Sequence, residues 1–275
     1  MKNQRIGCNT LYPDVNERKT GGWTFSPKKI MEALDKLSEI GYTDTEYSHI
    51  YHLSVDDATK IGEYARKIGI NSWSCHAAGP GGFNTGDKIQ AAVDANRHCV
   101  DISAALGAGV NVLHIWNQSH EDACRILDQV CQYAAERNVS IALENNRSLE
   151  CMDFILELVH SVDMPNIGIC VDTGHANLGD LGAGNAIRMA GSLLLTTHLQ
   201  DNLGERDDHM PPGMGKIDWA DVFQALSEID YKRTLMLELT DAPTADSRVY
   251  DQDAEIKTGY RNVNRFLQSQ MKNSR

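Results

Sequence analysis

Long apolar runs are missing from this sequence of 275 residues. A membrane-spanning helix needs about 20 consecutive apolar residues, and no stretch approaches that length. The first 15 residues, MKNQRIGCNTLYPDV, also lack the apolar centre of a secretion signal. We therefore expect a cytoplasmic protein without a membrane partner.

Paired cysteines are missing as well. The seven cysteines are an odd number, and they are scattered along the chain without a C-x-x-C pair. This pattern disfavours a disulfide framework and fits reduced thiols in the cytoplasm. Several lie in apolar runs, where a thiol acts as a small core side chain: Cys99, Cys131 and Cys170.

The sequence has no cluster of Lys and Arg. Its 26 basic residues are outnumbered by 38 acidic ones, which gives a formal net charge of −12. Proteins that bind nucleic acid usually present a basic face, because neutralised phosphates release counterions and add affinity. The charge therefore disfavours a nucleic-acid partner.

Eight short apolar or β-branched runs are present, separated by amphipathic stretches of helical length. The runs cover residues 5–12, 41–48, 70–77, 111–116, 140–145, 167–175, 193–201 and 234–239. Three clear helical stretches cover residues 26–41, 56–69 and 121–138. In the first stretch, Ser26 and Pro27 form a start signal and Gly41 a stop signal.

This alternation predicts a parallel sheet covered by helices. Eight units in a chain of this length predict a single (β/α)8 TIM barrel, with residues 1–275 as one domain. The alternative is a doubly wound open sheet, which wants a Gly-rich phosphate turn after its first strand. The residues GCNTLYPD do not supply that turn.

Carboxylates and imidazoles gather where the predicted strands end. In a barrel these ends face one cavity. The residues concerned are His76, His114, Glu144, Asp172, His175, His198, Asp201 and Glu238, with Asp207, Asp208 and His209 in the loop after the seventh strand. Several carboxylates placed together repel one another, so they need a cation or protons. Oxygen and imidazole ligands suit Mn²⁺, Co²⁺, Mg²⁺ or Zn²⁺.

At these residues the chain resembles the xylose-isomerase-like TIM barrels, which include sugar isomerases, sugar epimerases and apurinic endonuclease IV. The resemblance is carried by four motifs in order: ALENN (142–146), CVDTGHANLGD (170–180), THLQDNLGERDDHMPPGMGKIDW (197–219) and MLELTD (236–241). It implies a metal-dependent sugar isomerase or epimerase that transfers a proton through an enediolate.

The epimerase branch implies one divalent metal ion, with ligands at Glu144, Asp172, His198 and Glu238. The two glutamates would also be the catalytic acid/base groups. The resemblance implies that His175 and His209 contact the substrate. We also expect His76 and His114 at the substrate, and Trp116 as an apolar wall for a sugar face.

The endonuclease branch implies three zinc ions and abasic DNA as substrate. Its extra ligands match His76, His114, His175, Asp207 and His209, so the ligand residues do not separate the two branches. The surroundings favour the isomerases: Gly174 stands where the nuclease has Cys, and NNRSLE follows Glu144 where the nuclease has a small, Gly-rich stretch.

A third alternative is a keto-inositol dehydratase, which would begin with the same proton abstraction. A binding module without catalysis is disfavoured by the acidic ring. The basic candidates for a phosphate clamp are Arg147, Arg206 and Lys216, and Arg206 has Asp207 beside it. We therefore favour an unphosphorylated sugar or polyol as substrate. The resemblance allows a homo-oligomer, and the sequence identifies no interface.

Overall fold

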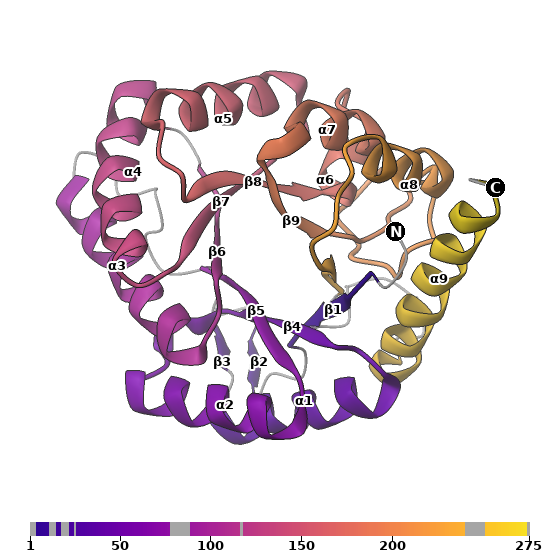
Figure 1. The fold of residues 1–275 in the computed structure, drawn as a ribbon, viewed down its shortest axis with the longest axis horizontal. Helices are drawn as coiled ribbons and strands as arrows, with labels where there is room; N and C mark the ends of the chain where they lie inside the picture. Colours follow the sequence, from indigo (N-terminus) through magenta and orange to yellow (C-terminus); the bar gives the residue numbers. More distant parts are fainter. Residues whose placement is uncertain are drawn as a thin grey trace.

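The fold was analysed in a computed structural model that describes residues 4–10, 15–17, 22–24, 26–77, 89–115, 118–239 and 251–273. Figure 1 looks down a ring of strands surrounded by helices. The eight strands of the ring are β1 (Ile6–Asn9), β4 (Asp44–Ser48), β5 (Asn71–His76), β6 (Val110–Leu113), β7 (Ser140–Glu144), β8 (Ile167–Asp172), β9 (Leu194–His198) and β10 (Leu235–Leu237). Each of the eight predicted runs contains or overlaps one of these strands.

The strands form one parallel sheet in the order β10-β1-β4-β5-β6-β7-β8-β9. Its two edges meet just beyond β9, where the N–H of Leu199 donates to the carbonyl of Met236 at 2.8 Å and Leu199 bridges to Leu237 in parallel. The sheet therefore closes into a TIM barrel, as predicted, and the open-sheet alternative is wrong.

The helices follow the strands in sequence and form the outer layer, apart from the short α6 at the end of β8. They are α1 (Pro27–Ile40), α2 (Val55–Ile68), α3 (Ile89–Leu106), α4 (His120–Ala135), α5 (Leu149–Val162), α6 (Thr173–Asn177), α7 (Ala183–Ala190), α8 (Trp219–Glu228) and α9 (Gln252–Asn273). Two 3-10 turns, η1 (Ile50–His52) and η2 (Gly191–Leu193), accompany them. A short antiparallel hairpin of β2 (Val15–Glu17) and β3 (Gly22–Thr24) follows β1 and was not predicted.

The first helix has the caps that the sequence predicts. The Ser26 hydroxyl accepts the N–H of Lys29, and Pro27 is the first helical residue. Gly41 ends the helix with φ of +110°, a conformation that a glycine adopts without strain. The apolar face of α1 is buried, so the 3.6-residue period reports packing against the barrel.

Two register shifts in the sheet place polar side chains at the centre of the barrel. Between β4 and β5 the shift leaves Glu46 opposite Ser74. Between β8 and β9 a second shift leaves Asp172 opposite His198. Bulges of this kind redirect side chains and are common beside active sites.

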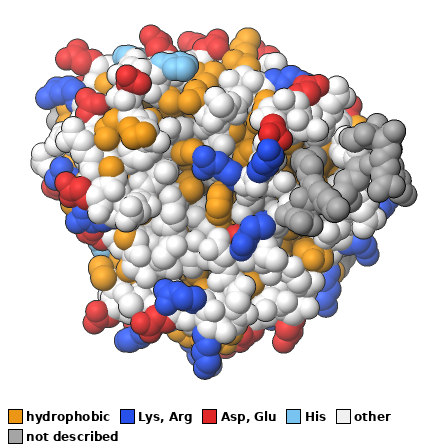
Figure 2. Space-filling model, viewed as in Figure 1, with side chains coloured by type: hydrophobic (Ala, Val, Ile, Leu, Met, Phe, Trp, Pro, Cys, Tyr) orange, Lys and Arg blue, Asp and Glu red, His pale blue; other side chains and the backbone are white. Residues whose placement is uncertain are grey.

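The described helices include none that is both long enough and apolar enough to cross a membrane. On the face drawn in Figure 2, acidic, basic and apolar side chains are interspersed among the coloured residues.

Candidate metal centre

Four buried side chains converge at the carboxyl ends of neighbouring strands. Glu144, Asp172 and His198 are the last residues of β7, β8 and β9, and Glu238 directly follows β10. Their exposed fractions are 3%, 0%, 0% and 6%. Each offers one ligand atom, and these four atoms all lie within 4.8 Å of one another. The structure thus brings together the four residues predicted as metal ligands; their role as ligands stays a prediction.

Unsatisfied polar atoms at this point fit a bound cation. Both carboxylate oxygens of Glu144 and Nδ1 of His198 are buried without a hydrogen bond from the described residues. Nδ1 of His198 lies 3.3 Å from Glu144 Oε1 and 3.1 Å from Glu238 Oε2. Buried polar atoms without partners are costly, and a divalent ion would satisfy all three.

The donors of the centre are oxygen and imidazole nitrogen. Cys170 lies beside Glu144 and His198, but burial raises the pKa of its thiol well above the usual value. The thiol therefore keeps its proton at neutral pH. Oxygen and nitrogen donors without thiolate suit Mg²⁺, Mn²⁺, Co²⁺ or Zn²⁺.

The electrostatics show how strongly this centre attracts positive charge. Burial alone would raise the pKa of Glu144, but His114 and His198 hold it well below its usual range. Burial alone would lower the pKa of His198, but the charges around it, including Glu238, raise this pKa well above its usual value. Burial raises the pKa of Asp172 to about 7. Protons and a metal ion would therefore compete for the same atoms.

Two further histidines lie beside Oε2 of Glu144. His76 Nε2 lies 3.6 Å and His114 Nε2 lies 3.2 Å from Glu144 Oε2. His76 also contacts Glu238, with Nδ1 3.2 Å from Oε1. Burial lowers the pKa of His114 to about 4. Glu144, His76 and His114 form a second group able to hold an ion, so the structure places both histidines at the centre.

His175 and His209 share a carboxylate, and His175 also lies 3.3 Å from Glu144 through Nδ1 and Oε1. His175 Nε2 and His209 Nε2 lie 3.1 Å and 3.2 Å from Asp207 Oδ2. His175 belongs to α6 and not to the preceding strand, because Asp172 ends β8 and caps α6 by accepting the N–H of His175 at 2.6 Å. Burial alone would lower the pKa of His175, but Asp172 and Asp207 raise it to about 12.

Two acidic residues expected in the ring point elsewhere. Asp201 is buried in the loop after β9, where its carboxylate accepts the N–H groups of Gly213 and Gly215 and the indole N–H of Trp219. Asp208 lies 3.3 Å from Arg206, whereas Asp207 contacts His175 and His209. Trp116, which was expected to form an apolar wall for the sugar, lies outside the described residues.

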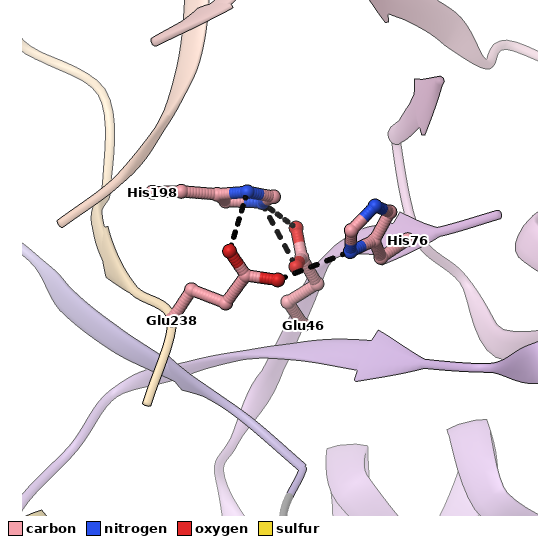
Figure 3. Close-up of side chains that lie close together, drawn as sticks. All are labelled: Glu46, His76, His198 and Glu238. Carbon is pink, nitrogen blue, oxygen red and sulfur yellow. Dashed lines mark hydrogen bonds and ion pairs between the residues drawn. The ribbon is translucent and has the colours of Figure 1, made fainter. Parts of the chain in front are cut away.

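Glu46 is a member of the centre that the sequence did not single out. It lies in β4 and is fully buried. Its Oε1 lies 3.0 Å from Nε2 of His198, the ring nitrogen that does not face Glu144 and Glu238. Figure 3 shows Glu46, His76 and Glu238 arranged around His198. The sequence signal that could have revealed Glu46 is a charged residue in the middle of a predicted core strand, residues 41–48.

A family model described as xylose isomerase-like TIM barrel matches residues 34–267. The chain is 27% identical over 250 residues to the uncharacterized protein y4fM of Sinorhizobium fredii, which covers 76% of this chain and 80% of that protein. It is 33% identical over 93 residues to the D-psicose 3-epimerase of Ruminiclostridium cellulolyticum, a match that covers 34% of this chain and 29% of the epimerase.

The fold itself is closely matched by solved structures. A structure of an L-ribulose 3-epimerase superposes with a TM-score of 0.80 and 18% identity, covering 98% of this chain and 97% of the other. At this identity the likeness concerns the fold, and it extends over nearly the whole of both chains.

Proposed function

Because the chain belongs to the xylose isomerase-like TIM barrel family, we propose that it is a divalent-metal-dependent sugar isomerase or epimerase. The observation that carries the proposal is the buried set of Glu144, Asp172, His198 and Glu238 at the barrel mouth. The relatives that are 3-epimerases of psicose and ribulose support the same class of chemistry.

In this proposal the four residues hold one divalent ion. Such an ion would supply Lewis-acid stabilisation of the negative charge that develops on the substrate oxygens. A carbon next to a carbonyl is barely acidic in water, so this stabilisation is what makes its proton removable.

The two glutamates are the proposed acid and base. Glu144 extends from β7 and Glu238 from the end of β10, so they reach the centre from strands separated by β8 and β9. A substrate between them presents opposite faces of one carbon to the two carboxylates. One removes a proton from the first face while the other returns a proton to the second face, which inverts the centre.

His175 and His209 are the proposed substrate contacts beside this pair. Asp207 holds both imidazoles from the same oxygen, so the two rings are oriented before substrate arrives. We propose His76 and His114 as further substrate contacts. An unphosphorylated sugar or polyol is the favoured substrate, because Arg206 is engaged by Asp208.

A second candidate is hydrolysis of a phosphodiester with several ions. It is favoured by the group of His76, His114 and Glu144, which lies beside the four-residue set and shares Glu144 with it. In that case His76 and His114 would bind one additional ion, and Asp207 with His175 and His209 would bind another. A keto-inositol dehydratase would use the same base and differ only in its product.

Metal counting and solvent exchange separate these candidates. Purified protein would be assayed for bound metal, then incubated with ketoses and keto-inositols in deuterated water. We expect one ion per chain and deuterium at the carbon next to the carbonyl of a ketose. Three ions per chain, cleavage of abasic DNA and no exchange with any ketose would overturn the isomerase proposal. Loss of water from a keto-inositol would identify the dehydratase.

A further inference from the structure

Glu46 is a buried carboxylate whose contacts join the barrel interior to the proposed metal centre. Its side chain is fully buried within β4. The Ser74 hydroxyl donates to its Oε2 at 2.6 Å, and His198 Nε2 lies 3.0 Å from Oε1 and 3.1 Å from Oε2. An ionised carboxylate only accepts hydrogen bonds, so both partners act as donors.

The register of the sheet creates this contact. The shift between β4 and β5 leaves Glu46 directly opposite Ser74, which brings the hydroxyl within reach of the carboxylate. His198, the last residue of β9, reaches the same carboxylate across the barrel, as Figure 3 shows. The first contact depends on the pairing of β4 with β5, and the second depends on the closed barrel.

The contact decides which nitrogen of His198 faces the centre. With its proton on Nε2 and directed at Glu46, the imidazole turns Nδ1 towards Glu144 and Glu238, 3.3 and 3.1 Å away. Histidines that bind metals commonly donate the other ring N–H to a carboxylate, which fixes the orientation of the ring and the position of its proton.

We propose that Glu46 is a positioning residue that holds His198 with Nδ1 towards the metal ion. The inference rests on the proposed function, because it assumes that the centre binds an ion. Glu46 acts through His198 and reaches neither the ion nor the substrate. Ser74 acts one step further out, by fixing Glu46 itself.

A competing arrangement would make Glu46 a ligand. Glu46, His76, His198 and Glu238 also offer four atoms within 4.8 Å of one another. An ion bound there through Nε2 of His198 would replace the hydrogen bond from this nitrogen to Glu46. The two arrangements predict different metal counts for a variant that lacks the Glu46 carboxylate.

The test measures metal affinity in two variants of Glu46. Zn²⁺ or Co²⁺ would be titrated into metal-free protein in competition with a chromophoric chelator. Glu46→Gln keeps the shape and one acceptor but loses the charge, so we expect affinity to fall by about 10-fold. Glu46→Leu removes both acceptors, and we expect a fall nearer about 100-fold. The number of ions bound should equal that of the wild type in both variants.

Asp44→Asn is the matched control. Asp44 is a fully buried carboxylate of the same strand, but it lies at the other end of β4 and pairs with Arg5. Its loss should reduce stability and leave metal affinity within about two-fold of the wild type. The absorption spectrum of bound Co²⁺ gives a second readout, which should change in the Glu46 variants and stay unchanged in Asp44→Asn.

Distinct outcomes overturn distinct claims. Wild-type affinity in both Glu46 variants would overturn the positioning role, and a lower ion count would make Glu46 a ligand instead. If neither variant folds, Ser74→Ala carries the test; it should weaken binding by a few-fold, and unchanged affinity would contradict the inference. A wild-type protein that binds no ion would overturn the proposed function itself.

Discussion

The side chain of Asn145 bonds to both backbone groups of Asp172. Its Nδ2 donates to the Asp172 carbonyl at 3.1 Å, and its Oδ1 accepts the Asp172 N–H at 2.8 Å. Both residues are fully buried. This pair joins the ends of β7 and β8, so it fixes the position of Glu144 relative to Asp172.

Replacing Asn145 by Ala should therefore weaken metal binding as well as the fold. The variant leaves a buried N–H and a buried carbonyl without partners, which destabilises by about 1–3 kcal/mol. Urea unfolding would measure the loss, and metal titration would measure affinity. Asn166→Ala is the control. Asn166 lies just before the start of β8, far from the centre, and its side chain donates to the backbone carbonyls of Cys131 and Val139. This control should lose stability only; equal affinity in the two variants would refute the role of Asn145.

Removing the metal should abolish activity and lower the melting temperature. An ion that binds only the folded state adds stability that grows with its concentration, by about 2.7 kcal/mol at 100 times its dissociation constant. Calorimetry before and after exhaustive chelation would measure this, with restoration by added Mn²⁺, Co²⁺, Mg²⁺ or Zn²⁺ as control. Full activity in protein that contains no metal would contradict the proposed mechanism.

His198→Ala should reduce metal affinity more than His175→Ala. His198 has Nδ1 in the four-residue set, whereas His175 also bonds to Asp207 and is proposed to contact substrate. Titration would give the affinities, and steady-state kinetics should show the larger rise in KM for His175→Ala. Equal loss of metal in both variants would favour a centre with several ions.

Glu144→Gln and Glu238→Gln should reduce turnover more than substrate binding. An amide keeps the shape and one oxygen donor but cannot take a proton, and loss of a general base typically reduces rate about 10²–10⁴-fold. With metal retained, each variant should still exchange the proton of one epimer with deuterated solvent and fail with the other. Near-normal exchange of both epimers in both variants would leave the two glutamates as ligands only.

Much of the fold could be predicted because its signals are local. The apolar runs, the caps Ser26 and Gly41, and the polar strand ends each lie within a few residues in sequence. The end of β8 was placed too late because Asp172 turns from strand residue to helix cap, a change that depends on its bond to the N–H of His175. The short β2–β3 hairpin has too few residues to show a period.

The parts of the centre that were missed depend on distant partners. Glu46 meets His198 across 152 positions of sequence, and a register shift directs it there. Asp201 was placed in the acidic ring because it follows a strand. Its carboxylate turns away because N–H donors from 12 to 18 residues further along are folded around it.

Asp201→Asn should destabilise the protein and disturb the loop after β9. An amide offers one acceptor where the carboxylate accepts several buried N–H groups, so we expect a loss of about 3 kcal/mol. Activity should fall further, because the same loop carries Asp207 and His209. Asp230→Asn is the control, since Asp230 pairs with Lys232 at the surface, and it should stay within about 0.5 kcal/mol. An unchanged unfolding midpoint in Asp201→Asn would refute the anchoring role.

The anchorage by Asp201 also lets part of this loop vary without moving the barrel. The backbones of Asp201 and Met210 bond to each other in both directions at 2.8 Å, so the excursion between them begins and ends at one fixed point. Residues 203–206 can then change in length or composition while the barrel and the four-residue set keep their places. Asp207 has to be kept, because it contacts His175 and bonds Gln200, which in turn bonds Asp172. Changing residues 203–206 beside it is therefore a route to a new substrate range on an unaltered metal centre.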